Sequence, residues 1–219
     1  MVNILLSLWT FAEPYIKNEM EKYIKPSNKV AIISLGQNDW YNDRNRYNAK
    51  YGLEGKHYLL PVSEFEKLGI NRKNIELVHY FEDNPEDMKR KINSSDIIMF
   101  TGGMPDKAMV RFKEKDICED IISFDKVIMG YSAGAILQLN SNFLSPDDDY
   151  PELMYTNGLS YISNDFYIEV HYSKEDNWRK LLGEIRNERN KPIYAIGDYG
   201  AVIIDECRNI KIFGDVTII

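Results

Sequence analysis

The stretch KVIMGYSAGAILQL, residues 126–139, decides the predicted fold and most of the predicted chemistry. It begins with an apolar run that is typical of a buried strand and ends in a helical pattern. Between them lies Gly-x-Ser-x-Gly, with Ser132 at its centre. The glycines permit a tight turn that lifts the serine above the sheet edge at a helix N-terminus, where N–H groups favour negative charge. We therefore predict that Ser132 is a nucleophile rather than only a helix cap.

The same alternation of strands and helices runs along the whole chain. Strands are expected at residues 3–9, 29–35, 75–81, 96–100, 126–130, 166–172, 193–204 and 209–218. Helices are expected at residues 12–25, 61–69, 85–93, 105–122 and 175–190. Such alternation predicts an α/β fold, a three-layer sandwich whose mostly parallel central sheet carries helices on both faces. We expect residues 1–219 to form a single domain.

Two local expectations concern the chain between the second and third strands. Residues 36–58 are polar and aromatic without a clear period, which predicts a long loop or an irregular lid. In the helix that follows, at 61–69, Ser63 and Glu66 have the spacing of an N-terminal capping box.

Composition excludes several classes of protein. The net charge of −7 disfavours a nucleic-acid partner, because such proteins neutralise phosphates with basic side chains. Cys118 and Cys207 form no Cys-x-x-Cys or Cys/His cluster, so a structural zinc site is not predicted. No apolar stretch reaches about 18 residues, and the apolar N-terminus lacks the features of a signal peptide. We expect a cytoplasmic protein without a membrane partner.

A nucleophilic serine needs a base, and the chain offers three histidines. His57 lies in the polar segment, and His79 lies inside a predicted core strand, where a structural role is expected. His171 lies at the end of the 166–172 strand, which in a parallel sheet is the edge that carries the serine turn. We therefore predict His171 as the base.

Two further parts of a hydrolase site have candidates. The oxyanion needs backbone N–H donors, for which we expect Ala133 and a residue of Thr101-Gly102-Gly103, the turn after the 96–100 strand. The acid that orients His171 stays open from the residues alone. The candidates are Asp147, Asp148, Asp149, Glu152 and Glu169, of which the last should share a strand face with His171.

Taken together, these segments resemble peptidase family S51, which includes dipeptidase E and cyanophycinase. The resemblance rests on Thr101-Gly102-Gly103, Gly130-Tyr131-Ser132-Ala133-Gly134-Ala135, Glu169-Val170-His171-Tyr172-Ser173, Ala195-Ile196-Gly197 and Ala201-Val202-Ile203. It covers roughly residues 1–205 and implies a fold similar to class I glutamine amidotransferases, with Ser in place of their Cys.

The resemblance also implies roles for individual residues. It implies Ser132 as nucleophile, His171 as base, and the N–H groups of Gly103 and Ala133 as the oxyanion hole. The acid of dipeptidase E follows its nucleophile by about fifteen residues, which points to Asp147. Cyanophycinase-like members have a site residue two positions before the histidine, which points to Glu169 as the alternative acid.

The chain departs from the family pattern where substrate is bound. Met104 follows the two glycines, where family members commonly carry Asn, Asp or Gln. Glu175, Asn177 and Lys180 stand where cyanophycinase-like members carry arginines. Arginines there would pair with a substrate carboxylate, so without them the sequence does not predict an aspartyl or cyanophycin substrate.

We therefore predict a serine peptidase that hydrolyses short peptides through an acyl-enzyme, with a small peptide as its partner and no metal or cofactor. A homodimer stays open. Two alternatives remain at this point: an α/β-hydrolase-type esterase, which shares the serine turn, and a non-catalytic ligand-binding relative of the amidotransferase fold. Against the esterase, only 39 residues separate Ser132 from His171.

Overall fold

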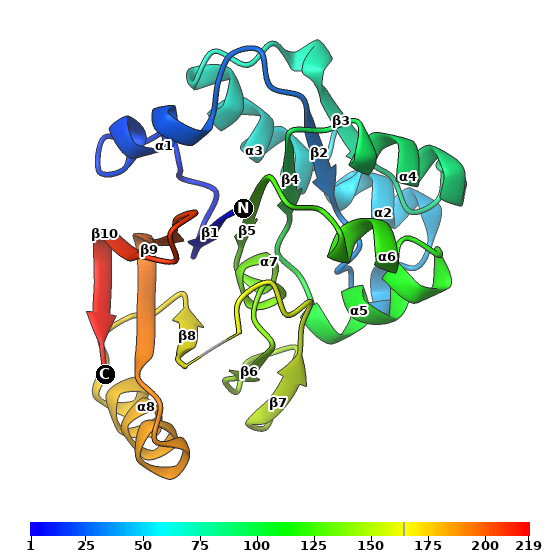
Figure 1. The fold of residues 1–219 in the computed structure, drawn as a ribbon. Helices are drawn as coiled ribbons and strands as arrows, with labels where there is room; N and C mark the ends of the chain where they lie inside the picture. The colour runs from blue at the N-terminus through cyan, green and yellow to red at the C-terminus, as the bar shows by residue number, and fades with distance from the viewer. Residues whose placement is uncertain (164) are drawn as a thin grey trace.

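A computed structural model describes residues 1–163 and 165–219, and its centre is an eight-stranded sheet (Figure 1). The strand order is β10-β9-β1-β5-β4-β2-β3, with β8 beside β9. The strands of this sheet are β1 (Val2–Leu6), β2 (Val30–Ile33), β3 (Ile75–Val78), β4 (Ile97–Phe100), β5 (Val127–Tyr131), β8 (Tyr167–Val170), β9 (Ile193–Ile204) and β10 (Ile210–Ile218). Neighbours among β1, β5, β4, β2 and β3 are parallel, whereas β9 is antiparallel to both β1 and β10.

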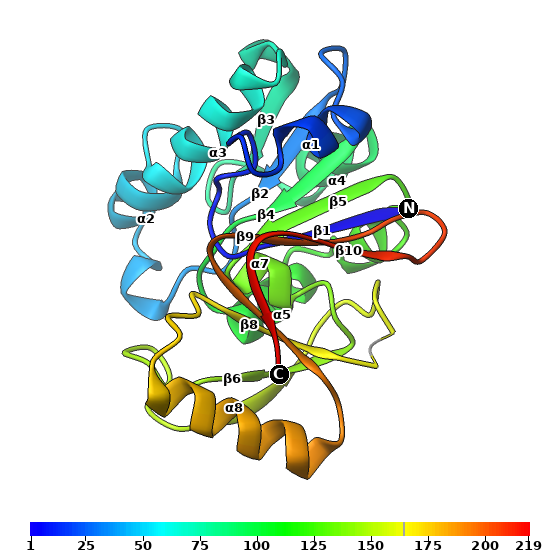
Figure 2. The same cartoon turned by 90° about the vertical axis from the view of Figure 1, so that its left-hand side faces the viewer.

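Helices cover both faces of this sheet, which confirms the predicted three-layer α/β fold (Figure 2). The α-helices are α1 (Lys17–Tyr23), α2 (Arg44–Tyr51), α3 (Lys56–Lys67), α4 (Pro85–Asn93), α5 (Pro105–Glu114), α6 (Cys118–Ile122), α7 (Ala133–Ile136) and α8 (Asp176–Arg189), and the 3-10 helices are η1 (Asp39–Tyr41) and η2 (Arg72–Asn74). Side chains of β2 alternate between two cores: Val30 and Ile32 face the core that contains Phe65 of α3, and Ile33 faces the core that contains Phe112 of α5. Strands buried on both faces explain the continuous apolar runs in the sequence.

The segment 36–58 is not the irregular loop that its composition predicts. It contains η1, α2 and the start of α3. The carboxylate of Asp43 caps α2 by accepting two N–H groups of its first turn. Tyr47 and Tyr51 lie four residues apart on one face of α2, are buried, and stack with ring centroids 5.6 Å apart. Two buried tyrosines are thus enough to fix a helix that is otherwise polar.

The start of the next helix was also predicted wrongly. Helix α3 begins at Lys56, after Gly55, and not at residue 61. Ser63 therefore lies inside the helix, where its hydroxyl donates to the carbonyl of Leu60, and it forms no capping box with Glu66.

Two further differences lie downstream. The predicted helix 105–122 is divided into α5 and α6 near Asp116, whose φ of 52° is incompatible with a helix. A separate antiparallel pair, β6 (Ser141–Leu144) and β7 (Met154–Asn157), was not predicted, and it follows the short helix α7 in the chain.

The direction of β8 matters most for the site. Strand β8 is parallel to β9, so it runs opposite to β1 and β5, contrary to the prediction that it shares their direction. Leu6 at the end of β1 pairs with Ala201, and Val170 at the end of β8 pairs with Ile196. The two strands therefore point at each other along β9, and their carboxyl ends meet near its middle.

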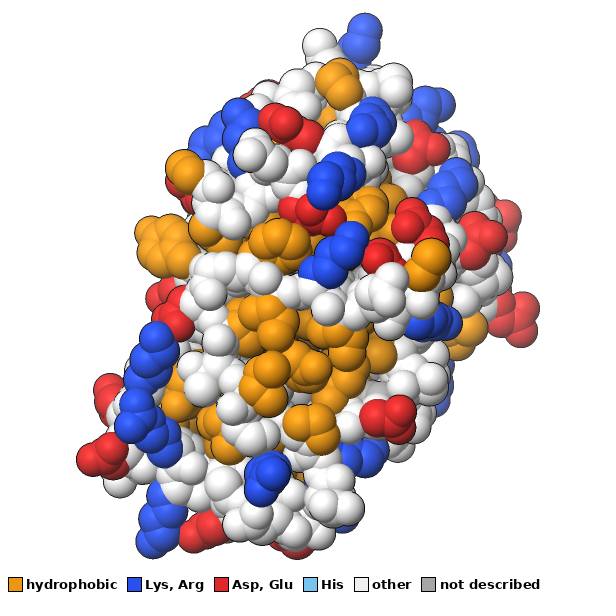
Figure 3. Space-filling view, turned by 60° about the vertical axis from the view of Figure 1, so that its left-hand side comes forward, with side chains coloured by type: hydrophobic (Ala, Val, Ile, Leu, Met, Phe, Trp, Pro, Cys, Tyr) orange, Lys and Arg blue, Asp and Glu red, His pale blue; other side chains and the backbone are white. Residues whose placement is uncertain are grey.

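Strand β10 forms one edge of the sheet and pairs only with β9 among the described strands. Ile210, Ile212 and Ile218 are exposed along it, and apolar side chains gather on the face of the molecule seen in Figure 3. None of the described helices is long and apolar enough to cross a membrane.

Candidate active site

The serine turn has the strained geometry that its sequence predicts. Ser132 has φ 53° and ψ −124°, a backbone conformation that L-residues rarely adopt, and its N–H donates to the carbonyl of Leu6 at 3.0 Å. A Cβ on Gly130 would lie 2.0 Å from the carbonyl oxygen of Gly134. A Cβ on Gly134 would lie 2.2 Å from the carbonyl oxygen of Phe100. Only glycine fits at both positions, so the motif is required by the close approach of backbone segments.

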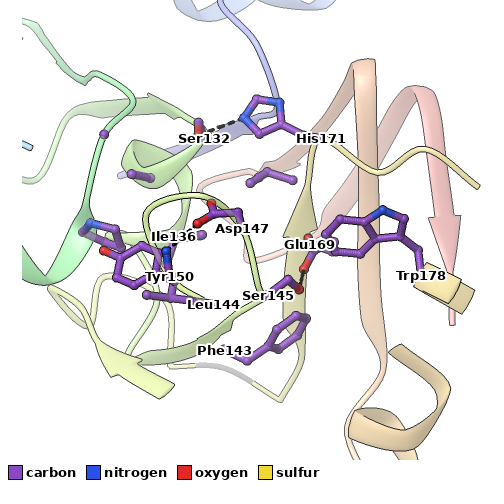
Figure 4. Close-up of a pocket in the computed structure, with 14 residues that line it drawn as sticks. Ser132, Ile136, Phe143, Leu144, Ser145, Asp147, Tyr150, Glu169, His171 and Trp178 are labelled. Carbon is purple, nitrogen blue, oxygen red and sulfur yellow. Dashed lines mark hydrogen bonds between the residues drawn. The ribbon is translucent and has the colours of Figure 1, made fainter. Parts of the chain in front are cut away.

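His171 reaches this turn from β8. Its Nε2 atom lies 2.9 Å from the Ser132 hydroxyl oxygen. Figure 4 draws this contact as a dashed line between the two side chains. The residue has φ 57°, which turns the chain out of the strand direction directly after Val170. The two residues predicted as nucleophile and base are thus within hydrogen-bond distance although 39 residues separate them.

The other ring nitrogen of His171 faces Ser7 and Asp198. The Ser7 hydroxyl oxygen accepts the His171 backbone N–H at 2.8 Å and lies 3.3 Å from Nδ1. The Asp198 Oδ1 atom lies 3.5 Å from the same nitrogen. Thr10 holds the Asp198 backbone in place by donating its hydroxyl to that residue's carbonyl at 3.2 Å. Sequence reasoning missed both Ser7 and Asp198, although Asp198 directly follows the quoted Ala195-Ile196-Gly197 stretch.

The two acids predicted from the sequence lie elsewhere. Asp147 orders its own turn, because its Oδ1 accepts the N–H groups of Asp149 and Tyr150 at 2.8 and 2.7 Å. Glu169 accepts the Ser145 hydroxyl at 2.8 Å. Among the described residues, no hydrogen bond or ion pair joins either acid to His171. The expectation of a shared strand face fails because β8 ends at Val170 and the backbone turns at the histidine.

Two unpaired N–H groups flank the serine. Neither Gly103 nor Ala133 has a hydrogen-bond partner for its N–H within residues 1–163 and 165–219. Gly103 has φ 141°, and a Cβ there would lie 2.2 Å from the carbonyl oxygen of Gly36. That carbonyl also accepts the N–H of Met104 at 2.6 Å, which fixes the turn. Both predicted oxyanion donors therefore lie beside Ser132, in the wall of one cavity.

This cavity has a volume of about 200 Å³ and extends from Ser132 and His171 toward Glu169 (Figure 4). Its other described lining residues are Gly103, Pro105, Ala133, Ile136, Phe143, Leu144, Ser145, Asp147, Tyr150, Val170 and Trp178. Burial raises the pKa of Glu169 to about 8, and the hydrogen bond from Ser145 offsets that only in part. The cavity thus joins the reactive pair to an apolar space that contains a buried acid.

The remaining histidines take no direct part in this pair. His79 is structural, as expected: its Nδ1 accepts the N–H groups of Phe81 and Glu82. His57 is half-buried in α3, and its Nδ1 lies 2.6 Å from the hydroxyl of Tyr131, next to the serine. Burial lowers the pKa of His57 to about 3, so the imidazole is neutral and Tyr131 donates to it. In the described part of the chain, no group of His, Cys, Asp and Glu is arranged to hold a metal ion.

Comparison with models of protein families matches residues 54–212 to peptidase family S51, which is more than half of the chain. The chain belongs to peptidase family S51. Membership makes it a peptidase of the serine hydrolase class and decides against the α/β-hydrolase esterase. No curated protein matches the sequence.

Solved structures share the fold of this S51 chain. One is a protein from Listeria monocytogenes EGD-e assigned as a peptidase E, with a TM-score of 0.63, 18% identity and 96% coverage of each chain. Another is a peptidase from an acI-B1 actinobacterium, with a TM-score of 0.64 and 15% identity, covering 98% of this chain and 87% of the other. At such identities the likeness concerns the fold.

Proposed function

We propose that this S51 peptidase hydrolyses short peptides through an acyl-enzyme formed on Ser132. The observation that carries the proposal is the 2.9 Å approach of His171 Nε2 to the Ser132 hydroxyl at a strained turn. His171 takes the hydroxyl proton while Ser132 Oγ attacks the scissile carbonyl carbon. The N–H groups of Gly103 and Ala133 hold the resulting oxyanion.

The intermediate then collapses and the peptide bond breaks. His171 gives its proton to the leaving amine, which departs and leaves the acyl group on Ser132. Water enters, His171 removes its proton, and the hydroxide adds to the ester carbonyl. Release of the carboxylic acid restores the Ser132 hydroxyl. The cavity of about 200 Å³ has room for little more than one side chain of the substrate.

We assign the orienting acid to Asp198 and not to Asp147. Asp198 Oδ1 faces Nδ1 of His171 at 3.5 Å, a distance that is expected to shorten when the imidazole becomes positively charged. The Ser7 hydroxyl supports the same nitrogen. Together they favour the tautomer whose Nδ1 carries the proton and whose Nε2 is free to accept from Ser132.

The nucleophile and base are tested by covalent labelling with a fluorophosphonate, measured by intact mass. We expect one adduct on the wild type and none on Ser132→Ala or His171→Ala. An unlabelled, folded wild type would count against the proposal.

The acid is tested by comparing Asp198→Asn with Asp147→Asn as its matched control. A buried triad aspartate contributes about 10⁴-fold to kcat, and Asp198 should contribute less because its side chain is 58% exposed. We expect a loss of roughly 10²-fold in Asp198→Asn and a much smaller one in Asp147→Asn, which keeps its acceptor oxygen. The reverse order would reassign the acid to Asp147.

A further inference from the structure

The feature that the proposed mechanism does not use is Glu169. It is only 6% exposed, yet it lines the cavity that begins at Ser132. Its Oε2 accepts the Ser145 hydroxyl, and its Oε1 has no hydrogen-bond partner among the described residues. A buried carboxylate without a cation is costly, so burial favours the neutral form of Glu169 and a bound cation would favour the ionised form.

Apart from His171, the side chains of this cavity that can carry a charge near neutral pH are both carboxyl groups. Asp147 is the other acidic side chain in the lining. Burial is the main reason why the pKa of Glu169 is raised, and the negative charge of Asp147 raises it further. No lysine or arginine is found among the described residues of the lining. Away from the oxyanion donors, a ligand carboxylate would therefore meet two acidic groups and no cationic side chain, whereas a cation would meet two attractive ones.

The walls suit a long side chain with a charged end. Phe143, Leu144 and Val170 provide apolar surface for a methylene stem. Trp178 also lines the cavity, and an indole face attracts a cation as well as a stem (Figure 4). Lysine and arginine combine such a stem with a cationic end, and neither aspartate nor leucine does.

We propose that this cavity binds the lysine or arginine side chain of a substrate residue that flanks the scissile bond, with Glu169 as the partner of its cation. The location next to the scissile bond rests on the proposed function of Ser132, whereas the cation site itself does not. In the empty cavity Glu169 is protonated at neutral pH. A bound cation converts it to a carboxylate, and its proton leaves to solvent, so that binding exchanges one proton for one ammonium or guanidinium group.

Binding is tested on full-length Ser132→Ala protein, which cannot turn the ligand over. The ligands are tripeptides that differ only in lysine, norleucine or aspartate, placed in turn at each of two adjacent positions. Titration calorimetry in two buffers of different ionisation enthalpy measures affinity and proton release. At one position we expect lysine to bind roughly 10- to 100-fold more tightly than norleucine, with aspartate weakest, and to release a proton at pH 7.

The role of Glu169 is tested by adding Glu169→Gln, with Glu184→Gln on the exposed face of α8 as the matched control. The first change should remove both the lysine preference and the proton release, and the second should keep them. Equal binding of lysine and norleucine at both positions, or tighter binding of aspartate, would overturn the inference even if Glu169→Gln failed to fold. A lysine preference that survives in Glu169→Gln would remove Glu169 from the site.

Cleavage by the wild type separates this inference from the proposed function. Equal cleavage of lysine and norleucine peptides, with fluorophosphonate labelling intact, would overturn the inference and leave the Ser132 mechanism standing. Selective lysine binding by a protein that is neither labelled nor active would overturn the mechanism and leave the cation site standing.

Discussion

Replacing Ser132 by glycine should stabilise the fold relative to replacing it by alanine. Both changes remove the hydroxyl, but only glycine relieves the backbone at φ 53° and ψ −124°. Strain of this kind costs about 1–3 kcal/mol. Glycine also gives the unfolded chain more freedom, which costs about 0.4–1 kcal/mol. The difference predicts that Ser132→Gly is about 1–2 kcal/mol more stable than Ser132→Ala.

The free energy of unfolding is measured by guanidinium titration, followed by tryptophan fluorescence. In a chain of this size, the difference corresponds to a Tm that is roughly 2–8 °C higher for Ser132→Gly. Ser173 is the matched control, because it is exposed, lies close to the site and has no positive φ. There the order should reverse, with alanine more stable than glycine. A Ser132→Gly protein no more stable than Ser132→Ala would refute the claim that this turn stores strain.

Two other predictions concern the walls of the site. Gly103→Ala should lower kcat by roughly 10²–10³-fold, because the new Cβ would meet the Gly36 carbonyl and displace an oxyanion donor. A Gly103→Ala protein with the kcat of the wild type would show that Gly103 does not have that role. Glu169→Gln should change how stability depends on pH. Because the folded pKa of Glu169, about 8, exceeds its ordinary 4.5, its stabilising contribution is complete below pH 4.5 and is lost as pH rises through 8. Between pH 5 and 9 the wild type should lose on the order of 4 kcal/mol more unfolding free energy than Glu169→Gln, and parallel curves would contradict the burial argument.

The central layers of the fold could be predicted because their strands are buried on both faces. Continuous apolar runs such as residues 126–130 are distinctive, and Gly130 is required by a backbone contact inside the motif itself, with the carbonyl of Gly134. Helix α2 escaped prediction because most of its surface is polar. Its burial rests largely on Tyr47 and Tyr51, whose spacing of four was the available clue.

Asp198, the acid that we propose for the site, escaped prediction for a different reason. Sequence patterns do not carry strand direction, and the place of His171 depends on β8 running opposite to β1. The partner of its ring then comes from the middle of β9, where Asp198 lies between the segments paired with β8 and β1. Spacing along the chain favoured Asp147, whereas pairing across the sheet favours Asp198.

The meeting of β1 and β8 along β9 also affects when the enzyme can act during its own synthesis. Ser7, Ser132, His171 and Asp198 come from four distant parts of the chain, and β9 holds the two halves together. A nascent chain that ends just after His171 contains both Ser132 and His171 but lacks the strand that aligns them. Under the proposed mechanism, peptidase activity therefore requires that β9 has been made and has paired with both β1 and β8.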